Sequence, residues 1–182
     1  ALPAFREFIE KYQIPFVGTY LATDYVPGHH DLFIGRTGLR GDRAGNFAMQ
    51  NSDLVLSIGS RLVVTVIGYD TKQFAREAKI AVVDIDPVEH QKKTLNIDLF
   101  INADAKEFLQ SFAPKNVPDI SEWRKLCLSW KEKYPVCLPE YRQSTKGINF
   151  YHFMDELSRQ LADGGVVVAD AGPRISSVPP ES

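Results

Sequence analysis

The sequence predicts an α/β fold built on a doubly wound parallel sheet, with a helical extension at its C-terminal end. Short apolar runs recur in the first part of the chain, at residues 14–18, 53–59, 79–86 and 98–102. Runs of this length are typical of strands buried on both faces of a parallel sheet. Segments with apolar residues at helical spacing separate the runs. Strands that alternate with helices favour parallel βαβ units.

The composition is that of a soluble globular protein with one domain, or one domain and part of another. Of its 182 residues, 44% are hydrophobic and 24% are charged, and the formal net charge is −2. The basic residues are scattered, which argues against nucleic-acid binding. No apolar run approaches the ~20 residues that cross a bilayer. Residues 1–10 have the pattern of an amphipathic helix rather than a signal peptide. With two cysteines, Cys127 and Cys137, we expect a cytoplasmic protein.

The first elements alternate between helix and strand. Apolar residues at helical spacing predict a helix over residues 2–12, and the run at 14–18 predicts the first strand. Residues 23–42 are rich in Gly, Asp and His and are interpreted as a long loop of functional character. Asp42 is a suitable cap for a helix over residues 42–51. The strand at 53–59 follows.

The next elements continue this alternation. A short helix is predicted over residues 71–78, and the strand at 79–86 has the clearest pattern in the chain. Pro87 suits the first turn of a further helix. After the strand at 98–102, Asp104 is positioned to cap another helix.

The organisation changes after residue 114. A linker rich in proline precedes a helix predicted over residues 120–134, and residues 136–147 are interpreted as a connector. Asn149 is expected to cap a helix, and a strand is predicted over residues 166–169. This last helix and strand have the pattern of the start of another α/β domain. The tail, residues 176–182, has no partner strand in the sequence.

Polar or glycine-rich segments follow each predicted strand, where ligands bind in doubly wound sheets. A glycine-rich loop before a helix N-terminus favours an anion, an arginine can hold a phosphate, and an acidic residue at a strand end commonly binds ribose hydroxyls. Together these features indicate an adenine-dinucleotide site. The four segments after predicted strands are Thr19-Tyr20, Gly59-Ser60-Arg61, Asp84-Ile85-Asp86 and Asp104-Ala105, and the loop before a helix N-terminus is Gly38-Leu39-Arg40-Gly41.

Several of these residues have structural interpretations as well. Asp104 is expected to be a helix cap first and a ligand contact second, and Asp86 before Pro87 is interpreted as a cap. Arg61 could instead pair with any nearby carboxylate. No GxGxxG motif follows a strand, so the common dinucleotide fingerprint is absent.

The sequence offers no convincing catalytic set. His29-His30-Asp31 suggests metal binding, but adjacent histidines on a loop point to opposite sides, and no Cys or His cluster supports them. A solvated loop is the favoured interpretation. The glycines of residues 38–42 are not followed by Lys and Ser or Thr, so they do not form a P-loop. His152 has the pattern of a partly exposed helix residue.

Three ordered stretches, PFVGTYLATDYVPGHHDLFIGRTGLRGDRAGNFAMQNSDLVLSIGSRL, FAREAKIAVVDIDPVEHQK and INADAKEFL, resemble the middle domain of acetolactate synthase and related thiamine-diphosphate enzymes. The resemblance runs from about residue 3 to residue 112. A later stretch, INFYHFMDELSRQLADGGVVVADAG, resembles the start of the pyrophosphate-binding domain. These enzymes contain a pyrimidine-binding, a middle and a pyrophosphate-binding domain, in that order.

The resemblance implies a Rossmann-like, FAD-binding-like middle domain over residues 1–114, lacking its first strand. It further implies a linker with a helix over 115–147 and a truncated start of the pyrophosphate-binding domain over 148–182. The Gly-Asp-Gly motif for metal and diphosphate and the glutamate that activates the thiazolium ring are not in this sequence. We therefore expect no catalytic residue and no metal ligand here. Thiamine diphosphate and Mg²⁺ are expected in the full-length enzyme, and the fragment alone is expected to be inactive.

In acetolactate synthase itself the middle domain holds FAD. The positions that match its FAD contacts are Thr19, Tyr20, Gly38, Leu39, Arg40, Gly59, Ser60, Arg61, Asp84, Ile85, Asp104 and Ala105. The chain departs from the FAD-binding members at residues 62–66, where an apolar run (LVVTV) replaces charged residues. This departure points toward a domain that is mostly structural or binds another nucleotide.

The parent enzyme implied by the resemblance decarboxylates a 2-oxo acid such as pyruvate and transfers the product to an acceptor, as a homo-oligomer. The alternative is a free-standing module that binds FAD or NAD, such as an electron-transfer flavoprotein or an NAD-dependent deacylase fold. The deacylase needs a catalytic histidine and usually a Cys-x-x-Cys pair, which this chain lacks. A flavoprotein module does not explain the start of a second domain.

Overall fold

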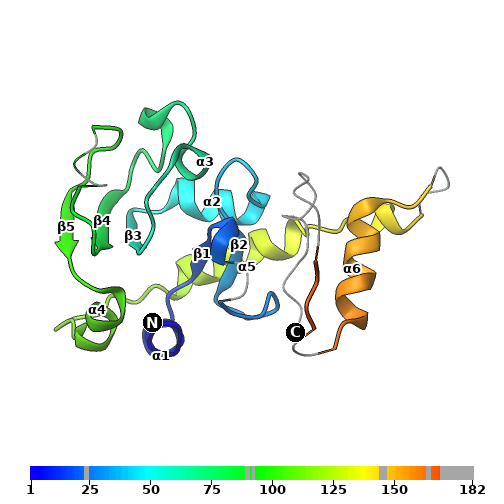
Figure 1. Ribbon diagram of the computed structural model, residues 1–182, viewed down its shortest axis with the longest axis horizontal. Coiled ribbons are helices and arrows are strands. Elements are labelled where there is room, and N and C mark those ends of the chain that lie inside the picture. The colour runs from blue at the N-terminus through cyan, green and yellow to red at the C-terminus, as the bar shows by residue number, and fades with distance from the viewer. Residues whose placement is uncertain (23–24, 89–90, 92, 144–146, 163–164, 169–182) are drawn as a thin grey trace.

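A computed structural model describes residues 1–22, 25–88, 91, 93–143, 147–162 and 165–168 (Figure 1). Helices and strands alternate over the first part of the described chain, and helices follow. In chain order the elements are α1 (Leu2–Tyr12), β1 (Phe16–Gly18), η1 (Tyr20–Ala22), β2 (Phe33–Arg36), α2 (Arg43–Asn51), β3 (Leu54–Ile58), α3 (Val64–Ile67), η2 (Thr71–Gln73), β4 (Lys79–Asp84), β5 (Leu99–Asn102), α4 (Ala105–Ser111), α5 (Ser121–Lys133), η4 (Pro139–Gln143) and α6 (Phe150–Gln160).

All strand pairs among the described residues are parallel, as the sequence predicts. β1 pairs with β2, and β3, β4 and β5 form a second sheet in that order. The single doubly wound sheet of the sequence prediction is thus wrong in one respect: the described strands form two sheets. Within the described chain β1 and β3 have no ladder of hydrogen bonds between them, and this gap divides the strands into two sheets.

Three groups of buried apolar residues hold the helices on the sheets. α1 and α4 lie side by side below the strands (Figure 1), and their core includes Phe8 and Leu109. That core also contacts Phe16 of β1 and Ile58 of β3, so the two sheets share it. α3 covers the other face of β3 and β4 with Ile67. The third group joins β2 to α2 and α5, and its members are Ile34, Ala44, Ala48 and Cys127.

β2 lies inside residues 23–42, for which the sequence predicts one long loop, so that prediction is wrong for Phe33–Arg36. All four residues of β2 are buried, and the strand pairs with β1. Its pattern is hard to recognise because the strand is short and contains Gly35 and a buried Arg36. Similarly, Val64–Ile67 of the apolar run form α3, a single helical turn that is absent from the elements predicted from the sequence.

Two predicted helices are shorter or absent. In the region of residues 71–78 the helix is limited to η2, followed by turns. Pro87 and Val88 lie in a turn, and the described residues from 93 to 98 form turns and bends with no α-helix. Proline is equally suited to a turn, and a helix needs a longer amphipathic stretch than this connection provides.

Two of the predicted helix caps, Asn149 and Asp104, form cap hydrogen bonds, whereas Asp86 accepts from the Val88 N–H at 3.0 Å within a turn. Asn149 accepts hydrogen bonds from the backbone N–H groups of Tyr151 and His152, and Asp104 caps α4. Asp42 occupies the N-cap position of α2, but its side chain forms no cap hydrogen bond. The carboxylate binds Arg36 instead.

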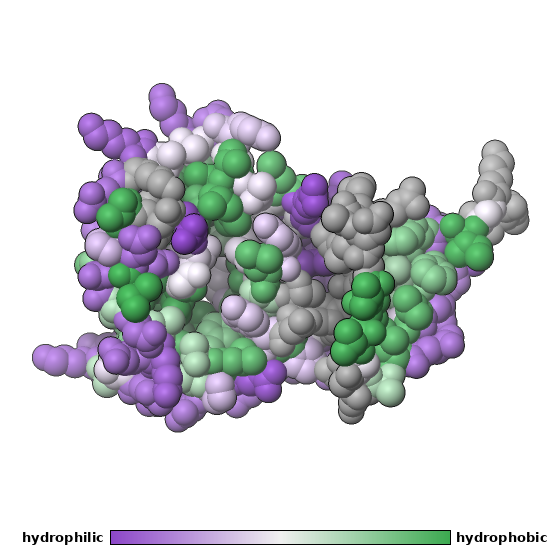
Figure 2. Space-filling view, viewed as in Figure 1, coloured by the Kyte–Doolittle hydropathy of each residue, from purple (hydrophilic) through white to green (hydrophobic). Residues whose placement is uncertain are grey.

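The C-terminal prediction is only partly tested. Residues 166–168 are described and do not form the predicted strand. Val166 and Val168 are 88% and 93% exposed, and Figure 2 shows hydrophobic surface at this segment beside α6. A strand needs a neighbouring strand to complete its hydrogen bonds, and this segment has none within the described chain. Residues 169–182 lie outside the described residues. They include the last residue of the predicted strand, residues 170–172 and the tail at 176–182. No described helix has the length and apolar character needed to span a bilayer.

Candidate functional site at the carboxyl ends of the strands

The structure places each predicted segment at the carboxyl end of a parallel strand. Because parallel strands end at the same edge of a sheet, the segments after β3, β4 and β5 are neighbours. The described positions are Thr19 and Tyr20 after β1, Gly38, Leu39 and Arg40 after β2, Gly59, Ser60 and Arg61 after β3, Asp84 and Ile85 at the end of β4, and Asp104 and Ala105 after β5.

The loop after β2 contacts the start of α3, which joins the two sheets at this edge. The backbone N–H of Leu39 donates to the carbonyl oxygen of Thr65 at 2.8 Å. Asn46 of α2 holds the same loop, because its Oδ1 accepts from the Gly38 N–H at 2.8 Å and its Nδ2 donates to the Gly38 carbonyl at 3.1 Å. The loop is therefore fixed by the protein itself.

The glycines of this loop are needed for contacts within the chain. A Cβ atom on Gly38 would collide with the carbonyl oxygen of Thr65, and Gly38 has a φ of +104°. A Cβ on Gly41, or on Gly45 in the neighbouring helix α2, would collide with the carbonyl oxygen of Arg36. The sequence interpretation of glycines that admit a pyrophosphate is untested, and close packing alone accounts for these three positions.

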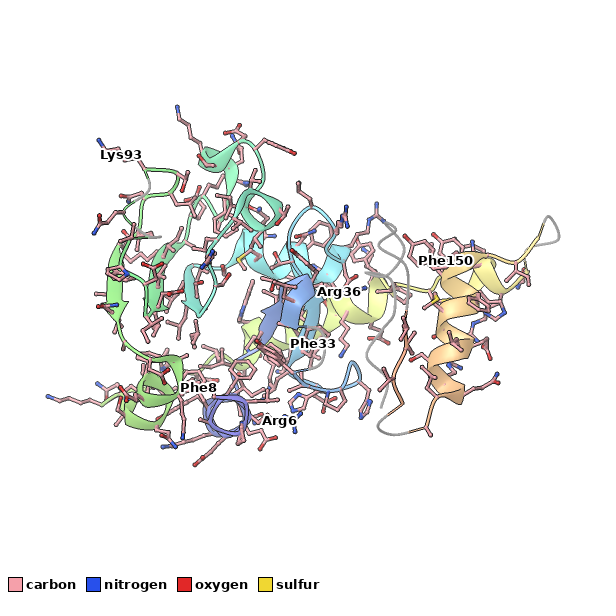
Figure 3. The ribbon with its side chains drawn as sticks, viewed as in Figure 1. Arg6, Phe8, Phe33, Arg36, Lys93 and Phe150 are labelled. Carbon is pink, nitrogen blue, oxygen red and sulfur yellow. The ribbon has the colours of Figure 1, made fainter. Side chains whose placement is uncertain are left out.

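A buried ion pair joins the two ends of this loop. Arg36, at the end of β2, lies near Phe33 in the middle of the molecule and is 4% exposed (Figure 3). Its Nη2 atom is 3.0 Å from Oδ1 of Asp42, and its backbone N–H donates to Oδ2 at 2.8 Å. The carboxylate of Asp42 thus places a negative charge at the start of α2, where an external anion would otherwise be favoured.

The ends of β3, β4 and β5 are joined by backbone and side-chain hydrogen bonds. The N–H of Gly59 donates to the carbonyl oxygen of Val83 at 2.9 Å, and Gly59 has a φ of +60° with open space around it. Asn102, the last residue of β5, donates from Nδ2 to the carbonyl oxygens of Asp84 and Ile85 at 3.0 and 2.9 Å. These bonds give the edge a defined shape.

The two predicted acidic residues at this edge also serve local structure. Asp104 Oδ1 accepts from the N–H groups of Lys106 and Glu107 at 2.8 and 3.1 Å, which confirms its interpretation as a cap. Asp84 Oδ1 accepts from the N–H of Asp86 at 2.9 Å. The bonds of Asp104 use one carboxylate oxygen, so a capping role and a ligand role are compatible at that residue.

Arg61 is exposed and lies at the edge of a pocket of about 300 Å³. Within the described chain it forms no hydrogen bond or ion pair, so the alternative of a carboxylate partner finds no support there. The pocket is largely apolar, with Ile67 and Leu95 among its lining residues. Leu62 turns into the core with a φ of +46° and 7% exposure. The apolar run therefore builds a core and a pocket wall, not a set of polar contacts.

Comparison with known proteins decides the family. The model of the thiamine pyrophosphate enzyme central domain matches residues 1–112. The chain belongs to this family. The acetolactate synthase large subunit of Lactococcus lactis subsp. lactis is 31% identical over 92% of this chain and 29% of its own length. Isozyme 1 of Escherichia coli is 29% identical over 92% of this chain and 29% of its length. The Corynebacterium glutamicum large subunit is 32% identical over 92% of this chain and 27% of its length. The chain spans less than a third of these relatives.

The two histidines of the sequence motif His29-His30-Asp31 differ in their surroundings. His29 is exposed. His30 Nδ1 accepts from the Leu32 N–H at 3.2 Å, and its Nε2 is 3.8 Å from a carboxylate oxygen of Glu10. Lys131 of α5 donates to the carbonyl oxygens of Gly28 and His30, and burial lowers the pKa of this lysine. Residues 28–32 are thus held by α1 and α5, and no metal-binding cluster of described residues includes either histidine.

Sequence reasoning missed three residues that shape the site: Asn46, Thr65 and Asn102. Asn102 had a usable signal, because an amide at the end of a parallel strand can bond to the neighbouring strand end. Asn46 and Thr65 act through contacts with Gly38 and Leu39, and such contacts depend on how α2 and α3 pack.

Proposed function

We propose that this chain is the central domain of an enzyme of the acetolactate synthase type. The whole protein decarboxylates a 2-oxo acid such as pyruvate and joins the resulting two-carbon unit to an acceptor. The family match over residues 1–112 carries this proposal, and relatives named as acetolactate synthase large subunits support it. Thiamine diphosphate, which supplies carbanion chemistry when bound, and Mg²⁺ are held by other parts of the whole protein.

The central domain's own role in this proposal is to hold an adenine nucleotide such as FAD at the ends of β3, β4 and β5. Three features fit such a ligand. Gly59 leaves open space beside the backbone, Arg61 offers an exposed guanidinium for a phosphate, and Asp84 lies where ribose hydroxyls are commonly bound.

A bracing role without a ligand is the second candidate, and specific observations favour it. The glycines at 38 and 41 are explained by packing, and Asp42 supplies a carboxylate at the start of α2. Leu62 and Val66 are buried in the core, and the exposed Val63 and Val64 have no polar side-chain atoms to offer a flavin. In this case the domain would support the catalytic domains mechanically.

We further propose that the whole protein supplies a parallel strand between β1 and β3 and is a homo-oligomer. Phe16 of β1 and Leu56 and Ile58 of β3 share one core, although the described strands do not pair there. A strand that leads into α1 would form a right-handed crossover to β1 and would lie in that position. The exposed Ile148, Val166 and Val168 would be covered by neighbouring parts of the protein or by a second subunit.

The test is an ultraviolet-visible spectrum of the full-length protein after incubation with FAD and desalting. Retained flavin that is lost in Arg61→Ala and Asp84→Ala, but kept in the exposed control Arg76→Ala, would support nucleotide binding at the strand ends. Full carboligase activity without any retained or required flavin would support the bracing role instead. If the full-length protein neither releases CO₂ from pyruvate nor forms a product with an acceptor, the proposed parent activity is wrong.

A further inference from the structure

The contact between η4 and α6 brings together three side chains with atoms that bind metals. Both elements lie at one end of the molecule, away from the strands (Figure 1). Cys137 precedes η4, and His152 and Asp155 lie three residues apart on α6, which places them on the same helix face. The Cys137 Sγ, a ring nitrogen of His152 and a carboxylate oxygen of Asp155 all lie within 4.8 Å of one another.

This combination of donors has a definite chemical preference. A thiolate, an imidazole and a carboxylate are ligands for Zn²⁺, whereas Mg²⁺ and Ca²⁺ avoid sulfur. With metal–ligand distances of about 2.0–2.3 Å, tetrahedral donors lie roughly 3.5 Å apart. The distances between the donor atoms would therefore have to shorten by about 1 Å. Rotation of the side chains can achieve this without a change of fold.

The cluster contains an unsatisfied polar atom. The Nδ1 of His152 is buried and has no hydrogen-bond partner. Its nearest acidic atom is Oε1 of Glu156 at 3.9 Å, which is beyond hydrogen-bond distance. Glu156 is on the same helix face as His152, so it can supply a fourth ligand, and water can do the same.

Two arginines now compensate the charge of Asp155, which is 5% exposed. Arg142 Nη2 is 2.5 Å and Arg159 Nη2 is 3.2 Å from the same carboxylate oxygen. The Arg142 side chain is 41% exposed and reaches Glu156 at 3.5 Å. It can therefore move toward solvent when a divalent cation takes over its charge, while Arg159 remains as a partner outside the metal site.

We propose that Cys137, His152 and Asp155 form a site for one zinc-class divalent ion that links η4 to α6. On binding, the Cys137 thiol gives its proton to solvent and its sulfur bonds to the metal. No oxidation or reduction occurs, and the exchange of one proton for a dication adds one positive charge, which the movement of Arg142 toward solvent offsets. The site is separate from the strand ends and would tie the segment after α5 to α6.

The experiment is an anaerobic titration of the reduced 182-residue chain with Co²⁺ and then Zn²⁺. We expect a thiolate-to-cobalt charge-transfer band that saturates at one equivalent and is removed by Zn²⁺. Cys137→Ser should abolish the band, and His152→Gln should weaken Co²⁺ binding ~100-fold or more, because a lost ligand matters at least as much as a lost supporting contact.

Two controls make the titration decisive. His29→Gln removes an exposed histidine outside the cluster and should leave the band and the affinity unchanged. Circular dichroism should show that Cys137→Ser keeps the helix content of the parent chain. No charge-transfer band at equimolar Co²⁺, or a band that survives in Cys137→Ser, would overturn the proposal.

Discussion

At the scale of single residues, the buried pair of Arg36 and Asp42 is the most consequential feature. The Arg36 side chain is 5% exposed and that of Asp42 is 14% exposed. Burying two charges costs a large part of their attraction, but removal of one partner leaves the other without compensation. Arg36 is the last residue of β2 and Asp42 ends the glycine loop, so loss of the pair also disturbs the carboxyl end of β2.

Replacement of Asp42 should therefore destabilise the domain strongly. We expect Asp42→Ala to lower the free energy of unfolding by about 3–5 kcal/mol, because the Arg36 guanidinium becomes an unpaired buried charge. Denaturation in urea, followed by circular dichroism, measures the change. The exposed pair of Lys125 and Glu122 provides the control, and Glu122→Ala should cost less than about 1 kcal/mol. Equal, small losses for both variants would contradict the prediction.

Substitutions at Gly38 and Gly59 distinguish the cost of close packing from the cost of backbone conformation. Both have positive φ, but a Cβ on Gly38 meets the Thr65 carbonyl, whereas a Cβ on Gly59 meets nothing within 4 Å. Gly59→Ala should cost about 1–2 kcal/mol from conformation alone. Gly38→Ala should cost roughly 1–3 kcal/mol more because of overpacking. Thermal and urea unfolding of the two variants tests this order, and a Gly59 variant as damaged as the Gly38 variant would refute it.

At the scale of elements, helix ends determine which side chains are left for a ligand. Asp104 uses one oxygen to cap α4, and Asn149 caps α6 in the same way. Asp42 lies at the N-cap position of α2, but its carboxylate binds Arg36 and forms no cap hydrogen bond. Asp and Asn both favour N-cap positions, but of these three residues only Asp104 and Asn149 act as caps. Asp42 has a neighbouring arginine and is an ion-pair partner instead.

Variants of Asp104 distinguish a cap from a ligand contact. Asp104→Asn should leave the unfolding free energy nearly unchanged, since Asn is as good an N-cap as Asp, whereas Asp104→Ala should lose about 1 kcal/mol. If Asp104 also binds ribose hydroxyls, Asp104→Asn should lower flavin retention by the full-length protein while stability is kept. Unfolding curves and the flavin spectrum give the two readouts independently. A large loss of stability in Asp104→Asn would show that the charge itself matters.

At the scale of the whole molecule, the two parallel sheets share a core but not a hydrogen-bond ladder in the described chain. β4 is paired on both sides, whereas β1 and β3 each have one paired neighbour among the described strands. Amide groups of such edge strands are open to solvent or to another strand. The proposed additional strand would remove both edges.

Hydrogen exchange should reveal this difference directly. In the 182-residue chain we expect the slowest amide exchange in β4, at Val82 and Val83, which are fully buried, and faster exchange in β1 and β3. In the full-length protein, β1 and β3 should gain protection because a strand fills the position between them. Mass spectrometry of both proteins makes the comparison, with α4 as an internal reference. Unchanged exchange at β1 and β3 would contradict the inserted strand.

Much of the fold followed from the sequence because its signals are local. The amphipathic pattern of α1, the apolar runs of β3 and β4, and the caps at Asp104 and Asn149 depend on neighbouring residues along the chain. The position of the candidate site was predictable too, because parallel strands end at a common edge. The family resemblance also came from ordered motifs in the sequence, and the family match confirms it.

Tertiary structure alone decided the remainder. β2 forms because its backbone pairs with β1, and its four residues show no strand pattern by themselves. Residues 166–168 have a strand-like composition but no neighbour among the described strands, so they form none. The partnership of Arg36 with Asp42 and the contact of Gly38 with Thr65 likewise depend on how separate segments pack. Secondary-structure propensity depends on adjacent residues, whereas strand pairing and close backbone contacts depend on segments that are distant in the sequence.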